Sequence, residues 1–374
     1  RRTARFSVIS APPPIQSAPA WYRAKGPARL LTGTAIEKET VMEERITLDY
    51  GSGGLRTAEL IDRLLVPAFQ NDALAALGDG AVLHNAGSPL VFSTDSFVVT
   101  PWRFPGGDIG KLAVCGTVND VCMAGGEPRY LSLSFLIEEG FLLRDLEEIV
   151  RSIAEEAKRA GVSIVTGDTK VVEHGKGDGI YLNTSGIGFL RAPGLSRDAI
   201  RPGDVVLVSG SVGCHGAAVL MARGDLPCEG ELLSDCRPLH ELSAAILRTG
   251  GVRILRDPTR GGVATTLNEF VERSPLCIEL DEDVIPVDPP VEAACDLLGL
   301  DPLYSACEGR LLAVVDPTLA DQALDALRAV EGGEGAARIG QVTENRPGCV
   351  VLHTALGGSR ILSKLTGAQL PRIC

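Results

Sequence analysis

Residues 131–170 read LSLSFLIEEGFLLRDLEEIVRSIAEEAKRAGVSIVTGDTK, and their pattern of apolar residues predicts the architecture. Apolar residues alternate with serines over 131–137, which is the two-residue period of a half-buried strand. A helix is expected next, because apolar residues recur at the spacing of one helical face: Leu146, Ile149, Val150, Ile153 and Ala157. Gly161 ends this helix, and 162–166 predicts another strand. Strand, helix and strand in succession predict an α/β fold.

Gly167-Asp168-Thr169-Lys170 comes directly after the second predicted strand. It offers an acid, a hydroxyl and an amine at a position where phosphate sites are commonly built. A solvated turn is the alternative interpretation of the same four residues.

The same succession of predicted strands and helices returns after residues 191–203, where two Pro-Gly pairs indicate an interdomain linker. Val205 to Val208 starts a second α/β unit, and a length of 374 residues suits two or three domains. The halves share an order of strands, helices and glycine turns, without a repeat at the residue level.

Two motifs of the second half carry chemistry. Asp257-Pro258-Thr259-Arg260-Gly261-Gly262 opens a predicted helix, so Arg260 and the helix N-terminus favour contact with a phosphate or an oxyanion. Glu308 immediately precedes an apolar strand at 311–315 and is a candidate acid–base, although a surface acid has the same pattern. His215 begins another helix, where bonding to a carbonyl is at least as good an explanation as catalysis.

Upstream, Gly51-Ser52-Gly53-Gly54 opens a helix and either cradles an anion or forms a plain loop. Carboxylates then follow on three different predicted elements, at Asp79, Asp95 and Asp120. A carboxylate inside an apolar strand is costly unless it is paired or bound to a cation. Several such groups favour Mg²⁺, which takes oxygen ligands and bridges phosphates.

The chain closes on Pro371-Arg372-Ile373-Cys374, with about 20 residues between the strand-like run 349–353 and the final thiol. Pro371 resists incorporation into a helix or a central strand. A thiol on such a tether is able to visit one catalyst and then another, and an accidental cysteine at a frayed end is the alternative.

Composition narrows the possible classes. A net charge of −12 argues against nucleic acid or an anionic membrane as the main partner. The ten cysteines contain no Cys-x-x-Cys pair, which indicates reduced thiols in a cytoplasmic protein. Residues 1–41 are rich in arginine and proline and are expected to be a disordered extension.

Six motifs, in this order, resemble those of the HypE family of hydrogenase maturation factors, in the aminoimidazole-ribonucleotide-synthetase-like (PurM-like) superfamily. They are Gly51 to Gly54, Ser93-Thr94-Asp95-Ser96, Asn119-Asp120-Val121, Gly167 to Lys170, Asp257 to Gly262 and Pro371 to Cys374. The resemblance covers residue 46 to the end. It implies a PurM-like domain for ATP binding and dimerisation at 42–192, a second α/β domain at 193–355 and a tail at 356–374. The N-terminal domains of a homodimer would share a β-barrel.

The resemblance also implies an activity. A HypF-type carbamoyltransferase would place a carbamoyl group on Cys374, and ATP would drive its dehydration to an S-cyanide. The cyano group would pass to hydrogenase iron through a HypC–HypD complex. Glu308 and Lys170 would act with Cys374 in catalysis. Mg²⁺ would be held by Asp79, Asp120 and Asp257. ATP would be contacted by Gly51, Ser52, Gly53, Gly54, Asp95, Asn119, Gly167, Asp168, Thr169 and Arg260.

The sequence departs from the family pattern at several positions. Gly78 replaces a second aspartate, which puts the number of metal ions in doubt. Around Glu308, Cys307 and Arg310 replace an expected asparagine and lysine. Other ATP-using members of the superfamily, such as selenophosphate synthetase or thiamine-monophosphate kinase, are the nearest alternative, and a non-catalytic carrier of a thiol adduct is the second.

Overall fold

The computed structural model describes residues 54–60, 62, 81–83, 89–224, 232–365, 367 and 372–374 of the chain. They belong to one compact unit, Ile46–Cys374. The predictions for 1–41, for Gly51 to Gly53 and for Asp79 lie outside the described residues. Among the described helices, none combines the length and hydropathy that a membrane crossing requires.

The first sheet has the strand order β1-β2-β7-β5-β6. Its strands are β1 (Ala81–Leu83), β2 (Leu90–Phe97), β5 (Gly126–Glu138), β6 (Ser163–Val172) and β7 (Ile180–Leu190). β5 and β6 run parallel, joined by a helical crossover as the sequence predicted, and the other neighbours run antiparallel. A small ribbon of β3 (Arg103–Phe104) and β4 (Gly107–Asp108) lies apart from this sheet.

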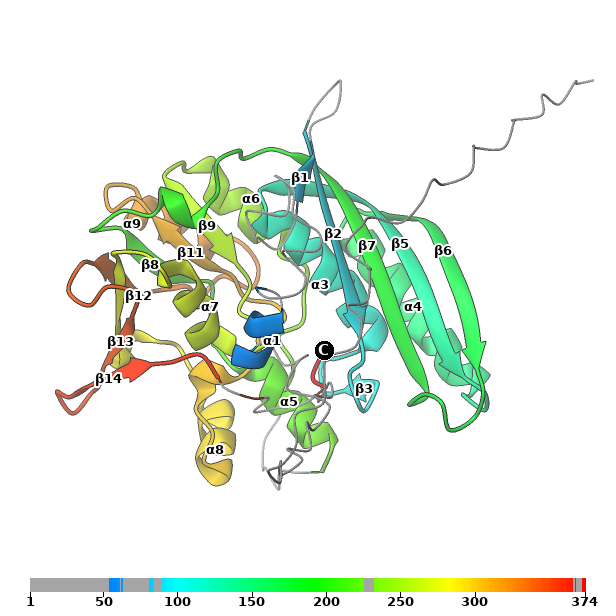
Figure 1. Cartoon of the computed structure of the whole chain (residues 1–374). Coiled ribbons are helices and arrows are strands. Elements are labelled where there is room, and N and C mark those ends of the chain that lie inside the picture. The colour runs from blue at the N-terminus through cyan, green and yellow to red at the C-terminus, as the bar shows by residue number, and fades with distance from the viewer. Residues whose placement is uncertain are drawn as a thin grey trace, which may run out of the picture. The chain divides into compact units, whose positions relative to one another are not determined.

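Helices α3 (Ile109–Met123) and α4 (Leu143–Arg159) cover one face of this sheet (Figure 1). The Asp108 side chain caps α3 by accepting from the backbone N–H groups of Gly110 and Lys111. α3 is buried on nearly all sides. It packs close to β7 because Gly186 has no side chain, since a Cβ there would lie 2.7 Å from Thr117 Cγ2. The polar residues of α3 therefore lie in the interior.

The second sheet has the order β14-β13-β10-β12-β8-β11-β9. Its strands are β8 (Val205–Val208), β9 (Val252–Arg256), β10 (Cys277–Asp281), β11 (Leu312–Val315), β12 (Ala337–Thr343), β13 (Val350–His353) and β14 (Ser359–Leu362). Every residue of β8 and β11 is buried. Strand β14 extends the sheet beyond the run at 349–353 and lies inside the segment 356–374 that was predicted to be the tail.

The remaining helices are α1 (Leu55–Leu60), α5 (Cys214–Ala222), α6 (His240–Arg248), α7 (Gly262–Val271), α8 (Pro289–Leu298) and α9 (Ala320–Arg328). Short 3₁₀ turns lie at Arg197–Ala199, Glu282–Val284 and Pro302–Tyr304. The predicted linker at 191–203 contains the first of these turns. One hydrophobic cluster includes residues of α3, α6 and β11 together with Ile373 and Cys374, so both halves of the protein pack against the chain end.

Candidate active site

The last three residues are docked against the end of β2, beside β3 (Figure 1). The backbone N–H of Val98 donates to the Cys374 carbonyl at 3.1 Å, and that of Thr100 donates to the Arg372 carbonyl at 3.2 Å. This alternating pattern is that of a short antiparallel strand pair. Cys374 is only 7% exposed, so the terminal thiol lies inside the protein.

Side chains from the second half hold the same segment. His215 Nε2 lies 2.6 Å from the carbonyl oxygen of Ile373, and its Nδ1 lies 2.8 Å from Ser234 Oγ. The Arg223 guanidinium donates to the carbonyls of Thr100 and Arg372. The alternative interpretation of His215, a helix-start histidine bonded to a carbonyl, is therefore the observed one, and that carbonyl belongs to the tail.

Arg372 itself fixes the turn into the docked position. Its backbone adopts a left-handed conformation, with φ of 54°. The side chain donates to the Val98 carbonyl, pairs with Asp178 and lies over the Tyr181 ring at 5.9 Å. The motif Pro371 to Cys374 thus uses its arginine to anchor its cysteine.

The Cys374 thiol faces a cation. Arg260 Nε donates to Cys374 Sγ at 3.0 Å, from the loop that opens α7 as predicted. The pKa of the thiol is nevertheless raised to about 12, mainly by burial; Arg260 opposes this shift, and Glu308 and Asp95 add to it. The docked thiol is therefore neutral at physiological pH.

Three carboxyl groups surround this point. Burial raises the pKa of Asp95 and raises that of Asp257 to about 6. It raises the pKa of Glu308, which is 2% exposed, well above the usual range, with Cys236 and Asp257 adding to the effect. Carboxyl groups whose pKa is raised in this way, here against the opposing charges of Arg260 and Arg256, are typical of catalytic and cation-binding sites.

The Asn119-Asp120 pair of α3 faces in two directions. Asp120 Oδ2 accepts a hydrogen bond of 2.6 Å from Ser93 Oγ on β2. The Asn119 amide donates to the carbonyls of Arg237 and Glu308 and accepts from the Leu239 N–H. The structure therefore places the Asn119 side chain in contacts with the protein's own main chain.

Two of the three predicted magnesium ligands, Asp120 and Asp257, lie in the described part of the chain. Asp120 and Asp257 both lie close enough to the Cys122 thiol to raise its pKa, although burial is the main cause of that shift. No group of three or more His, Cys, Asp or Glu side chains in the described part of the chain has a metal-binding arrangement. Burial raises the pKa of Asp257 although Arg256 opposes the shift, and a buried carboxyl oxygen is the kind of donor that Mg²⁺ takes.

Gly167 to Lys170 lie elsewhere. They are inside β6, at the edge of the sheet, and do not form the turn after a strand that the sequence predicted. The register explains this, because β6 continues to pair with β5 as far as Val172. Lys170 Nζ donates to Asp168 Oδ1 at 3.1 Å, and both side chains are exposed. β7 and β5 separate this strand from β2, so one chain does not bring Lys170 to Cys374.

The end of the predicted glycine loop lies against the base of the tail. The Leu55 N–H donates to the Leu365 carbonyl at 2.7 Å. A Cβ at Gly54 would approach that oxygen to 2.5 Å, so only glycine fits there.

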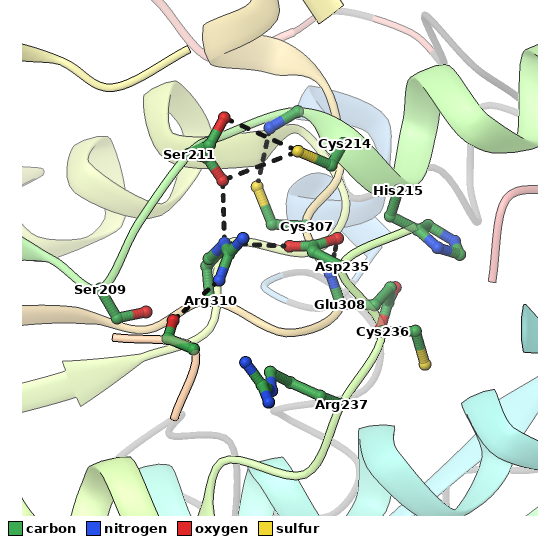
Figure 2. A network of polar contacts seen from close by, with 12 residues as sticks. Ser209, Ser211, Cys214, His215, Asp235, Cys236, Arg237, Cys307, Glu308 and Arg310 are labelled. Atoms are coloured by element: carbon green, nitrogen blue, oxygen red, sulfur yellow. Dashed lines mark hydrogen bonds and ion pairs between the residues drawn. The ribbon is translucent and has the colours of Figure 1, made fainter. Parts of the chain in front are cut away.

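Sequence analysis missed a polar network next to Glu308, which is shown in Figure 2. Asp235 Oδ1 accepts from the backbone N–H of Glu308, and its Oδ2 lies 3.7 Å from Arg310 Nε. The two residues that depart from the family pattern take part: Cys307 Sγ accepts from the Gly213 N–H, and Arg310 donates to the Ser211 and Gly332 carbonyls. Asp235 lies in a stretch without periodicity, which gave no signal.

Two family models match the chain. The N-terminal domain of AIR synthase related proteins matches residues 77–190, and the C-terminal domain matches residues 201–353. The chain is 51% identical over 333 residues to carbamoyl dehydratase HypE of Cupriavidus necator, which covers 88% of this chain and 95% of that protein.

Solved structures agree with these matches. The maturation protein HypE in complex with ATP superimposes with a TM-score of 0.74 at 48% identity, over 87% of this chain and 99% of that one. A chain of a HypE–HypF complex superimposes with a TM-score of 0.77 at 45% identity, over 82% and 99%.

Proposed function

The chain belongs to the HypE family of carbamoyl dehydratases, and from this membership we propose that it uses ATP to convert an S-carboxamide on Cys374 into an S-cyanide. The product, a protein thiocyanate, would supply cyanide ligands for the iron of nickel–iron hydrogenase. The observation that carries the proposal is the Cys374 thiol, docked beside Arg260 and among Asp95, Asp257 and Glu308.

The reaction needs a better leaving group than an amide oxygen. The carboxamide oxygen attacks the γ-phosphorus of ATP, the bond to ADP breaks, and the oxygen later departs as phosphate while both N–H protons are lost. Arg260, which already contacts the sulfur, stabilises the negative charge on the activated oxygen. The ionised form of Glu308 accepts a proton from the carboxamide nitrogen, and the raised pKa of this buried carboxyl group makes it a stronger base.

Magnesium fits the same set of residues. We propose that Asp79, Asp120 and Asp257 would hold the metal and that Asp95 would contact ATP or the metal. When bound, Mg²⁺ would neutralise charge on the phosphates. Ser93 orients the carboxylate of Asp120 through its hydrogen bond.

A homodimer explains the position of Lys170. β6 is a sheet edge with exposed apolar residues, and Val165 and Val171 are 58% and 67% exposed. The unpaired backbone groups of an exposed edge strand can bond a strand of another chain. A groove of about 580 Å³ runs along it, lined by Leu133, Phe135, Ile164, Val165, Thr166, Gly167 and Asp168. In the proposed dimer, Gly167 to Lys170 of one copy act at the site of the other, where Lys170 balances the phosphate charge.

The thiol chemistry requires further partners. A HypF-type carbamoyltransferase would load Cys374, and a HypC–HypD complex would receive the cyano group. Because the docked thiol is buried and neutral, both exchanges require the tail to leave its site. The cysteines in the described part of the chain are free, which fits a cytoplasmic location.

The test is intact mass after incubation with Mg-ATP, carbamoyl phosphate and a HypF-type carbamoyltransferase. We expect a carbamoyl adduct that then loses one water, and no adduct in Cys374→Ala. An adduct that never loses water would favour a carrier without dehydratase activity. The absence of any adduct, with an active transferase, would favour a small-molecule kinase of the same superfamily.

A further inference from the structure

Glu308 is held through both polar groups of its own backbone. Its N–H donates to Asp235 Oδ1 at 3.2 Å, and its carbonyl accepts from Asn119 Nδ2 at 3.2 Å. The carboxyl group, by contrast, has a buried Oε1 atom with no hydrogen-bond partner. The position of this carboxyl group therefore depends on the main chain and its two side-chain contacts.

Asn119 belongs to α3 of the first half, and it is completely buried. Its Nδ2 also donates to the Arg237 carbonyl at 3.1 Å, and its Oδ1 accepts from the Leu239 N–H at 2.8 Å. A primary amide offers two N–H donors, and both are used here. Asn119 thus joins α3 to Glu308 and to the neighbouring segment 235–239.

Asp235 acts from the opposite side. Its other oxygen lies near Arg310, which is itself anchored on the carbonyls of Ser211 and Gly332 (Figure 2). The two segments are in close contact, because a Cβ at Gly309 would lie 1.7 Å from the Asp235 carbonyl oxygen. Glu308 therefore cannot move without disturbing 235–239.

We propose that Asn119 and Asp235 are positioning residues that fix the Glu308 carboxyl group relative to the carboxamide on Cys374. The inference rests on the proposed function, in which Glu308 accepts the proton. It also gives Asn119 a different role from the ATP contact expected from the sequence. Asp120, the next residue of α3, accepts a hydrogen bond from Ser93. The same turn of α3 therefore carries a proposed Mg²⁺ ligand and a residue that bonds the backbone of the proposed proton acceptor.

The test is a single turnover of carbamoylated protein with Mg-ATP, followed by intact mass. Asn119→Ala should slow the loss of water by about 10- to 100-fold, because small misplacements of catalytic groups have effects of this size. Its ATP affinity, measured by calorimetry, should stay within about twofold of the parent's, since the amide is already bonded to the protein's own main chain. An unchanged rate, or a lower ATP affinity that accounts for the slower rate, would overturn the inference.

Thr117→Val is the matched control. Thr117 lies on the same buried helix, but its hydroxyl bonds Thr184 on β7 instead of Glu308. This variant should lose stability without a change in the single-turnover rate. A loss of rate as large as that of Asn119→Ala would show that any damage to α3 has this effect, and would contradict a specific role for Asn119.

Asp235 provides a test that does not depend on the folding of the Asn119 variant. Asp235→Asn keeps an oxygen that can accept from the Glu308 N–H, whereas Asp235→Ala removes it. The first should retain the rate within about threefold and the second should lose about 10-fold or more. Equal rates in the two variants would refute positioning through this bond. If the parent chain forms no thiocyanate at all, the proposed function fails instead.

Discussion

The sulfur of Cys374 lies 3.0 Å from Nε of Arg260, a residue 114 positions earlier in the chain. In this position the thiol is shielded from solvent and its pKa is about 12. In the docked tail, the sulfur therefore lies beside the proposed catalytic residues and is not accessible to molecules in solution. In the proposed function, loading the thiol and dehydrating its adduct therefore require two different positions of the chain end.

Loss of the Arg260 guanidinium should release the tail. A hydrogen bond to a charged group contributes about 1.5–3 kcal/mol, so Arg260→Ala should expose Cys374 roughly 10- to 100-fold more often. The measurement is the rate of iodoacetamide labelling of the C-terminal peptide, followed by mass spectrometry. Arg360→Ala, which breaks an ion pair with Asp301, is the matched control and should label like the parent. Equal labelling of all three proteins would contradict the role of Arg260.

Alkaline pH should also release the tail. The docked thiol ionises at a pKa of about 12, compared with an ordinary value of 9.0, so docking favours the protonated thiol. Docking is therefore fully favourable below pH 9.0 and weakens as pH rises towards about 12, by up to roughly tenfold for each pH unit. Fluorescence of a probe attached near the docked tail should report this loss. A docking equilibrium that does not change above pH 9.0 would contradict it.

Glu308→Gln should lose activity and gain stability. A missing proton acceptor costs about 100-fold or more in the dehydration rate. Burial raises the pKa of Glu308 well above its usual range, so the folded protein binds more protons than the unfolded chain. The free energy of unfolding therefore falls as pH rises from the pKa of Glu308 in the unfolded chain towards its raised pKa in the folded protein. Glutamine carries no charge, so urea unfolding should show a larger gain at about pH 8 than at about pH 5. A gain that is the same at both values would argue against a buried, protonated Glu308.

A charge on the β6 edge should prevent dimerisation. Val165→Asp places a carboxylate on the exposed apolar edge, and we expect a monomer by light scattering at micromolar concentration. Dehydration should fall with it, because Lys170 then has no second site to reach. Val150→Asp on α4 introduces the same charge at a residue that is 46% exposed, and should leave the dimer intact.

Sequence analysis predicts correctly the elements that are determined by the periodicity of apolar residues or by a motif at the start of a helix. The strand over 131–137, the helix that ends before Gly161 and the helix opened by Asp257 to Gly262 are all confirmed. The α/β class follows from them, since a crossover helix between two strands forces β5 and β6 to run parallel.

The rest depended on contacts between distant residues. Gly167 to Lys170 look like a turn because of Gly167, but pairing with β5 extends the strand through them. The buried position of Cys374 depends on Arg260, His215 and Val98, none of which is near it in sequence. Asn119 gave no sign that it bonds the backbone of Glu308, which is 189 residues away.

The attachment of Leu365 to Leu55 determines how far the reactive thiol can travel. Nine residues follow Leu365, so Cys374 can reach roughly 30 Å from that point at full extension. A group on so short a tether has an effective concentration on the order of millimolar at its own site. As long as the dimer is intact, the dehydration rate should therefore be first order and independent of protein concentration, and each adduct should react at the site where its own chain end docks. For the dehydration step, the length of the segment after Leu365, and not the affinity for a free substrate, sets the concentration of the adduct at the site.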